Sequence, residues 1–366
     1  MDKLRSNKFG LLLVFSICTF ILRYLATNHA AIVEQYYSRG FFLGIRWIID
    51  HTISWIPFPL IYLFFIAVII LLIRHYRKEI IPLKHWRQKL FSTFKMIVST
   101  LLILYCAFLW MWGFNYARVP IEEQLNINPK PLTKDDLESS LKALTPIILE
   151  ARSNIPNVGD AAINSKFMLK DFESTVLDLV MMTLKVHTYP IPSKVNARLL
   201  KPKGLLKGFG AIGIYFPFVG ESNMDTALHP LQWPEVLAHE FTHAYGFGDE
   251  GTCSFVAYLC LKDCKDPFLR YAGLLDYWRG LATNYLTYEP EAYREYRASL
   301  PVGLVNDLNA INDTNAKYKT FFPKFKRVAY DAYLKRQGID EGIENYNRVL
   351  MLVHAWETSL NRKTVN

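Results

Sequence analysis

Residues 53–73 read ISWIPFPLIYLFFIAVIILLI, a stretch of 21 residues without a charged side chain. At 1.5 Å per residue, a helix of this length crosses the roughly 30 Å of hydrocarbon in a bilayer. Residues 96–116 form a second such stretch, and residues 9–26 form another that is interrupted only by Arg23 near its end. The sequence therefore predicts three transmembrane helices, at about 9–26, 53–73 and 96–116.

The basic residues of the chain are concentrated in its first third. The whole sequence has a formal charge of +9, and residues 1–118 hold 14 Lys and Arg against 4 Asp and Glu. Within that part, residues 74–95 hold seven basic residues against Glu79 alone. By the positive-inside rule this loop lies in the cytoplasm, so three spans place residues 119–366 outside it. We expect a multi-pass protein of the cytoplasmic (inner) membrane with an extracytoplasmic C-terminal domain.

Residues 9–26 and residues 119–366 narrow the class of protein further. Residues 9–26 are typical of a signal anchor, and a cleaved signal peptide is the alternative, with the same orientation for everything that follows. Residues 119–366 are close to neutral and have no cluster of Lys and Arg interleaved with aromatic residues. This distribution argues against nucleic-acid binding and leaves the lipid bilayer as the partner of the basic first third.

Residues 119–366 show no internal repeat and read as one domain of the α+β class that is mainly α. Thr133 and Asp136 form a predicted capping box at the start of a helix. A second helix is expected at about 160–187, and 213–218 (GIYFPF) is at best an edge strand, because Pro217 has no N–H. Further helical patterns are expected at 234–246, 250–261, 267–278, 289–299 and in two C-terminal segments that break at Gly338.

Residues 237–244 read LAHEFTHA and contain the pattern H-E-x-x-H. The pattern follows Pro234 and precedes Gly246, which are typical start and stop signals of a helix. Residues four apart lie on one face of a helix, so His239 and His243 can offer two imidazole nitrogens to one Zn²⁺. Glu240 then lies beside the metal without binding it. Two ordinary helix histidines are the alternative interpretation.

The residues after this helix supply a third ligand. Gly246 and Gly248 are expected to take the φ > 0 conformations that reverse the chain, and Asp249 is a predicted N-cap of the next helix. The reversal brings Glu250 back toward the two histidines, with Asp249 as the alternative ligand. Ser254, one turn after Glu250, can hydrogen-bond a ligating histidine.

Two histidines and one glutamate leave the fourth tetrahedral position of Zn²⁺ for water, which is the arrangement of catalytic zinc sites. Zinc lowers the pKa of such a water to about 7, and Glu240 can take its proton and pass it to a leaving amine. The sequence therefore predicts metal-assisted hydrolysis of peptide bonds, with Glu240 as the general base and His239, His243 and Glu250 as ligands.

Other residues of suitable chemistry are assigned structural roles. Cys253, Cys260 and Cys264 are expected to be small apolar helix residues, with a second metal site as the alternative. His187 and His229 are lone histidines near prolines and are expected to be solvated. Four downstream side chains are available to stabilise an oxyanion, although each is more typical of a structural role: Tyr333, Tyr346, Arg348 and His354.

Several stretches of the chain together resemble a known family. They are 34–38 (EQYYS), 57–59 (PFP), 115–118 (NYAR), 213–223 (GIYFPFVGESN), 239–250, 333–335 (YLK), Gln337-Gly338 and Tyr346. On these residues the sequence resembles a bacterial family of membrane proteins that is catalogued only as a domain of unknown function, DUF3810, and that carries a zincin-like H-E-x-x-H. In zincins an edge strand lies beside the zinc helix and binds substrate in extended form, and 213–218 is the candidate here.

The resemblance implies that the ligand glutamate stands seven residues after the second histidine, at Glu250. The family usually continues with Asp-Glu-Ala-Asn, where this chain has Gly251, Thr252, Cys253 and Ser254. We therefore expect a membrane-anchored zinc metallopeptidase that acts on peptides or protein segments outside the membrane. A zinc-binding but non-hydrolytic protein that recognises envelope peptides or a partner is the alternative. Neither the substrate nor the oligomeric state follows from the sequence.

Overall fold

The structure, a computed structural model, describes residues 2–321, 328, 331–332, 334–335 and 347–365, and these are mainly helical. They divide into two compact units. The first unit is Met1–Val119 together with Phe216–Glu221, and the second is Pro120–Tyr215 with Ser222–Asn366. Sequence analysis divided the chain into 1–118 and 119–366. The segment Phe216–Glu221 therefore packs with a unit far from it in the sequence.

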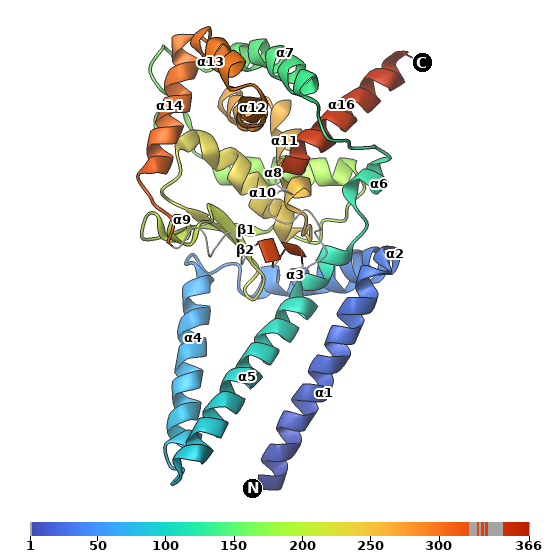
Figure 1. The fold of residues 1–366 in the computed structure, drawn as a ribbon, viewed down its shortest axis with the longest axis vertical. Coiled ribbons are helices and arrows are strands. Elements are labelled where there is room, and N and C mark those ends of the chain that lie inside the picture. Colours follow the sequence, from blue (N-terminus) through green and yellow to red (C-terminus); the bar gives the residue numbers. More distant parts are fainter. Residues whose placement is uncertain (1, 322–327, 329–330, 333, 336–346, 366) are drawn as a thin grey trace. The chain divides into compact units, whose positions relative to one another are not determined.

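Three helices of the first unit are long and apolar enough to cross a membrane. They are Lys8–Thr27 within α1 (Asp2–Thr27), Leu60–Ile80, which joins α4 (Leu60–His75) to the π-helix η2 (Tyr76–Ile80), and α5 (Trp86–Met111). Most of their apolar side chains are exposed, as contact with lipid requires. Helix α1 packs against α5 (Figure 1). The expected apolar helices are confirmed, and they indicate a membrane-associated protein.

The expected limits of two transmembrane helices, the second and the third, were wrong at both ends. The second helix begins at Leu60 instead of Ile53, because Pro57 and Pro59 lack the N–H that a helix interior needs. It also continues to Ile80, through basic residues that were expected in a loop. The third helix spans Trp86–Met111 instead of 96–116. Hydropathy marks the part of a helix that suits lipid and does not mark where the helix ends.

An ion-pair network in the first unit joins the π-helix η1 (Val33–Phe41) to Arg118, which follows the 3₁₀ turn η3 (Gly113–Ala117). The helices α2 (Ala30–Ile32) and α3 (Phe42–Thr52) flank η1 in the sequence. The Glu34 carboxylate accepts hydrogen bonds from Arg39 Nε and from Arg118 Nε and Nη2, all at 2.8 Å. Glu34 and Arg118 belong to two of the stretches that carry the family resemblance.

The segment Phe216–Glu221 completes the first unit. Glu221 Oε2 accepts a hydrogen bond from the Leu60 N–H at 2.8 Å, at the first residue of α4. Because Pro59 provides no side-chain cap, Glu221 satisfies a helix donor that would otherwise be left open. The ring of Phe218 stacks on Phe64, with centroids 4.8 Å apart. These contacts explain why the segment groups with residues 150 positions earlier.

The second unit is a helical assembly with one small sheet in its described part. Strands β1 (Asn196–Leu200), β3 (Glu221–Asp225) and β2 (Gly213–Phe216) pair in that order, so β2 is an edge strand, as expected. The other elements are α6 (Ile121–Leu125), α7 (Lys134–Ser153), η4 (Ser165–Phe167), α8 (Phe172–Val186), α9 (Leu205–Phe209), η5 (Pro230–Gln232), α10 (Trp233–Ala244), α11 (Glu250–Lys262), α12 (Pro267–Tyr288), α13 (Pro290–Ala298), α14 (Val302–Ala316) and α16 (Arg348–Val365).

Helix α10 is the centre of this unit. It packs against α8, α11 and α12, while α12 packs against α7 (Figure 1). Every α10 residue from Val236 to Ala244 is buried. A helix that is buried on all sides has no solvent for its polar side chains, so each one needs a partner or a function.

Local signals placed some helix ends correctly and others wrongly. The Thr133–Asp136 capping box at the start of α7 is confirmed. The helix expected at about 160–187 begins only at Phe172, because Arg152 binds the carbonyls of Gly159 and Ala161 and holds that stretch in a loop. Helix α12 continues ten residues past the expected end at 278. The expected break at Gly338 lies outside the described residues.

Candidate metal centre

The two histidines of the H-E-x-x-H pattern face the same side of α10. Pro234 stands in the first turn, where its missing N–H costs nothing, and the helix ends at Ala244. His239 Nε2 and His243 Nε2 lie 3.0 Å apart, and both side chains are buried. The spacing of four residues thus aims two imidazole nitrogens at one point.

A tight reversal follows the helix. Gly246 has φ 88°, and its N–H donates to the His243 carbonyl at 2.9 Å. Gly248 was also expected at positive φ, but it is not among the glycines with that conformation. Asp249 caps α11, because its Oδ1 accepts hydrogen bonds from Thr252 N and Oγ1, both at 2.6 Å. One positive-φ residue and one cap are therefore enough to start α11 beside α10.

The reversal brings Glu250 to the histidines. Its Oε2 lies 3.0 Å from His239 Nε2 and 3.3 Å from His243 Nε2. Ligands at 2.0 to 2.1 Å from a tetrahedral Zn²⁺ would be about 3.3 Å from one another. The three atoms therefore have the spacing of three corners of a metal tetrahedron. Asp249 is committed elsewhere, since its Oδ2 lies 2.8 Å from Arg348 Nη1.

Hydrogen bonding fixes how the two rings present their nitrogens. His243 Nδ1 lies 2.7 Å from the Phe247 carbonyl, which can only accept, so Nδ1 carries the hydrogen. A neutral ring then directs the lone pair of Nε2 toward Glu250. His239 Nδ1 lies 3.0 Å from Ser254 Oγ, the contact expected one turn into α11. His239 Nε2, His243 Nε2 and Glu250 Oε2 thus converge at a point where a cation would stabilise the carboxylate and any unprotonated ring nitrogen.

The charges of these groups reflect the same crowding. Burial opposes a charged ring at His243, yet Cys253 and the Glu250 carboxylate together raise the pKa of His243 well above its usual value. Burial also opposes charge on Glu250, but the two histidines lower the pKa of its carboxyl well below the ordinary range. A positive charge therefore stabilises the buried Glu250 carboxylate, and either a proton or a metal ion can supply it.

Glu240 lies on the same helix, next to the edge strand β2. Its side chain is buried, and a Cβ on Gly213 would come within 2.4 Å of Glu240 Oε1. The carboxylate also receives a backbone hydrogen bond from Tyr215. Its Oε2 has no hydrogen-bond partner among the described residues. Burial raises the pKa of Glu240 to about 8, with His243 opposing and Glu250 adding to the shift.

Cys253 is a site residue that sequence reasoning assigned to packing. Together with His239 and His243 it forms a buried group whose nitrogen and sulfur atoms lie within 4.8 Å of one another and can hold a metal ion. Its Sγ is 3.3 Å from His243 Nδ1, whereas Glu250 lies toward Nε2. Burial raises the pKa of the Cys253 thiol to about 12. Its position three residues after Glu250, on one helix face, was the available signal.

Of the four residues considered for an oxyanion, two are described. Arg348, at the start of α16, forms ion pairs with Asp249 and Glu122, so its guanidinium supports the N-cap of α11. His354 lies further along α16 and is partly exposed. Tyr333 and Tyr346 lie outside the described residues. His229, expected to be solvated, is in fact buried, because it caps the turn that precedes α10.

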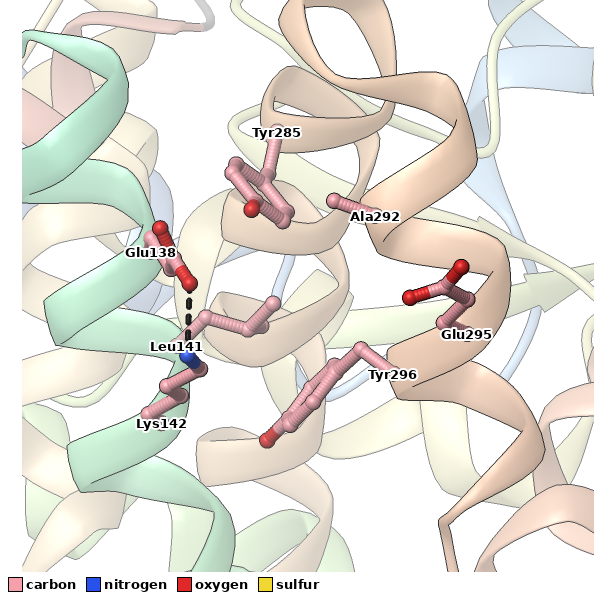
Figure 2. Close-up of a pocket in the computed structure, with 7 residues that line it drawn as sticks. All are labelled: Glu138, Leu141, Lys142, Tyr285, Ala292, Glu295 and Tyr296. Carbon is pink, nitrogen blue, oxygen red and sulfur yellow. Dashed lines mark hydrogen bonds and ion pairs between the residues drawn. The ribbon is translucent and has the colours of Figure 1, made fainter.

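The second unit also has a pocket of about 240 Å³ between α7, α12 and α13, remote from these residues in the sequence. In Figure 2 the Glu138–Lys142 ion pair lies along one side of it and Tyr296 on the other. Tyr296 is tied to Thr145, which also accepts a hydrogen bond from Trp278. The lining consists of this ion pair, the tyrosines Tyr285 and Tyr296, the apolar residues Leu141 and Ala292, and the Glu295 carboxylate.

Comparison with known proteins identifies the family to which this chain belongs. The family model of DUF3810, described as a protein of unknown function, matches residues 37–354. The chain belongs to the DUF3810 family. No curated protein and no solved structure matches it. Membership of DUF3810 covers both units and the whole metal centre, but assigns no activity to either.

Proposed function

We propose that this DUF3810 protein is a membrane-anchored, zincin-like metallopeptidase that hydrolyses peptide bonds outside the cytoplasmic membrane. The observation that carries the proposal is the convergence of His239 Nε2, His243 Nε2 and Glu250 Oε2 within 3.0 to 3.3 Å of one another. Two imidazoles and one carboxylate form a ligand set that suits Zn²⁺ and leaves a position open. Peptide hydrolysis is the reaction that such a set supports best.

Each of the chain's groups has a role in this reaction. His239, His243 and Glu250 hold the ion, while Ser254 and the Phe247 carbonyl orient the two rings through Nδ1. Zn²⁺ at such a site supplies Lewis acidity, which polarises a carbonyl and acidifies water. Glu240 Oε2 takes a proton from the attacking water and delivers it to the leaving amine.

The protonation state of Glu240 fits this role once a cation is present. Without a cation, burial and the neighbouring Glu250 carboxylate, opposed by His243, raise its pKa to about 8, which would keep it protonated at neutral pH. A nearby dication favours the carboxylate form and lowers the pKa toward neutrality. A base whose pKa lies near the working pH is the most effective one.

Strand β2 offers the place for a substrate. It is the edge strand of the sheet, and Gly213 and Tyr215 are in contact with Glu240. An extended peptide that pairs with this edge would carry its scissile carbonyl past the carboxylate. Gly213 is required there, because any side chain would occupy the space of Glu240 Oε1. The substrate class is therefore an extended peptide or an unfolded protein segment.

The location of the site follows from the charge distribution. Residues 74–95 hold seven basic residues, and a chain with three spans then exports everything after the third. This distribution supports our proposal of the cytoplasmic membrane, with the H-E-x-x-H helix on its outer side. A reporter fused after Arg118 is expected to be active outside the cytoplasm and one fused near Lys84 inside it.

One observation favours a second function, a metal-binding protein without hydrolysis. Cys253 stands where the family usually has alanine, and it joins His239 and His243 in a group that can hold a metal ion. A thiolate ligand would help to close the coordination sphere, as in structural zinc sites. The first function is preferred because the hydrogen bond to Phe247 occupies His243 Nδ1, the nitrogen that faces Cys253.

The test is Glu240→Gln in the full chain, purified in detergent without chelators. We expect one zinc per chain in both proteins and a loss of peptide hydrolysis of at least about 10²-fold in the variant. Glu291→Gln, at an exposed position of α13, is the matched control and should keep full activity. Equal turnover by Glu240→Gln and wild type would overturn the mechanism. Bound zinc without hydrolysis by the wild type would favour the second function.

A further inference from the structure

One end of the second unit carries exposed apolar side chains next to lysines. Strands β1 and β2 and helix α9 lie together at this end in Figure 1. Phe209 is 65% exposed and Phe321 is 60% exposed, and their rings meet edge to face with centroids 6.0 Å apart. Ile212 and Ile214 are exposed beside them in the sequence. Large exposed aromatic pairs are uncommon on soluble surfaces and mark binding sites.

Exposed basic residues outnumber acidic ones in the segments that carry these side chains. Residues 179–220 contain six Lys and Arg and no acidic residue. Lys201 and Lys203 are exposed before α9, and Lys317 and Lys319 are exposed just before Phe321. The nearest exposed acid on α14 is Asp313, one turn before its end. We call these four lysines and Phe209, Ile212, Ile214 and Phe321 the basic apolar surface.

Backbone and side-chain contacts join the two segments of the surface. The Phe321 N–H donates to the Gly208 carbonyl at 2.6 Å, and a Cβ on Gly208 would come within 2.4 Å of the Phe321 ring. Beneath them, Lys207 Nζ binds the Asn315 side chain at 2.8 Å and lies over the ring of Tyr318. The exposure of Phe209 and Phe321 is thus imposed by packing from below.

We propose that the basic apolar surface docks on an anionic phospholipid surface, with the phenylalanines inserted among the acyl chains and the lysines at the headgroups. Aromatic residues at the interface combined with basic residues are the chemistry of interfacial membrane binding. The three candidate spans keep every copy of this domain near a bilayer, so lipid is the partner present at the highest local concentration. This inference does not depend on the metal centre.

The experiment places an environment-sensitive fluorophore at the surface of the full chain in lipid nanodiscs. Phe209→Cys is labelled in a Cys18→Ser background, since the other four cysteines are buried. Val302→Cys is the matched control, because Val302 is 61% exposed at the opposite end of α14. With phosphatidylglycerol and quencher-bearing lipid in the nanodisc, we expect quenching at position 209 and none at position 302.

Charge provides the second arm. Replacing Lys203 and Lys319 by glutamine should lower the ratio of docked to undocked protein by about fivefold for each lysine. Replacing phosphatidylglycerol by phosphatidylcholine should act in the same direction. Equal quenching at positions 209 and 302, or quenching that is independent of both lysines and lipid charge, would overturn the proposal. A response to an acidic peptide without any response to lipid would also overturn it, in favour of a peptide ligand.

Packing provides the third arm. Gly208→Ala should displace the ring of Phe321 without touching a lysine, because the added methyl group occupies its place. We expect weaker quenching at position 209 in this variant, with zinc content unchanged. Unchanged quenching would show that the ring of Phe321 takes no part in docking.

Discussion

Two groups of buried polar side chains in the second unit are built in opposite ways. Around Asp307, on α14, each acceptor atom has its donors. Its Oδ2 accepts hydrogen bonds from Arg152 Nε at 2.8 Å and from the Tyr271 hydroxyl at 2.7 Å, and its Oδ1 accepts one from the Ile163 N–H at 2.7 Å. One carboxylate thereby joins α7, α12, α14 and the loop before α8.

The metal centre shows the reverse balance. Two imidazole nitrogens and one carboxylate oxygen crowd together, and Glu240 Oε2 has no hydrogen-bond partner among the described residues. Buried polar atoms that satisfy one another hold a fold together, whereas buried acceptors in excess cost stability unless a ligand supplies the missing positive charge. The comparison separates a cluster whose polar atoms satisfy one another from a cluster in the same unit that could hold a metal ion.

The largest expected effect comes from breaking the satisfied cluster. Asp307→Asn keeps the shape but leaves the Arg152 guanidinium without its counter-charge, and such a loss typically costs about 3 to 5 kcal/mol. We expect the free energy of unfolding of the full chain in detergent to fall by about that amount. Zinc per folded chain should not change. A variant as stable as the wild type would show that the Asp307 cluster does not hold the helices together.

Metal should stabilise the unsatisfied cluster in turn. A ligand that binds only the folded state adds about 2.7 kcal/mol at 100 times its Kd. We expect the free energy of unfolding of the wild type, derived from thermal unfolding, to rise by this amount when Zn²⁺ replaces the chelator. The free energy of unfolding of His243→Ala should not rise. Asp307→Asn should keep the full increment, because its cluster is separate. Stabilisation of His243→Ala by Zn²⁺ to the same degree would place the ion elsewhere.

A smaller effect is expected at the edge of the metal centre, where Arg348 acts as a positioning residue. Its guanidinium pairs with Asp249, the cap of α11, and with Glu122 of α6. Mutation of a residue that orients metal ligands without binding the metal itself typically lowers metal affinity about 10- to 100-fold. We expect Arg348→Ala to weaken zinc binding within that range, measured by competition with a chelator. Arg294→Ala, an exposed ion-pair partner on α13, should leave the Kd unchanged.

Sequence reasoning succeeded where neighbours along the chain decide the outcome. The spacing of H-E-x-x-H put His239 and His243 on one face, and a glycine followed by a cap brought Glu250 beside them. The capping box at Thr133 is of the same kind. Each depends on residues within about a dozen positions, so the pattern in the sequence and the contact in space coincide.

Contacts between distant residues were beyond that reasoning. The loop before α8 is held by Arg152 and by Asp307, which lies 144 residues after Ile163. Arg348 reaches Glu122 across 226 positions. The residues next to them in the sequence do not distinguish these paired charged side chains from charged side chains on the surface. The same holds for Phe216–Glu221, which packs with the first unit. Cys253 differs, because its position three residues after Glu250 was a local signal and was assigned to packing.

The smallest effect concerns a third buried histidine, His229. Its imidazole has a structural role, in contrast to the two imidazoles of the metal centre. His229 Nδ1 accepts a hydrogen bond from the Leu231 N–H at 3.3 Å and so caps the turn before α10. Burial lowers the pKa of His229 below its usual value, with Asp307 opposing the shift. Because the unfolded ring binds a proton more readily than the folded one, stability falls as pH drops below about 6.5.

His229→Asn keeps a capping acceptor at this position and removes the titration. We expect its free energy of unfolding to depend less on pH than that of the wild type between about pH 7 and pH 5, with chelator present in both. The difference should grow as the pH falls from about 7 to about 5, because the lowered pKa of the folded ring makes its protonation unfavourable to folding. Identical pH profiles would show that His229 stays neutral in both states. The profiles should converge above about pH 7, where the ring is neutral whether the chain is folded or not.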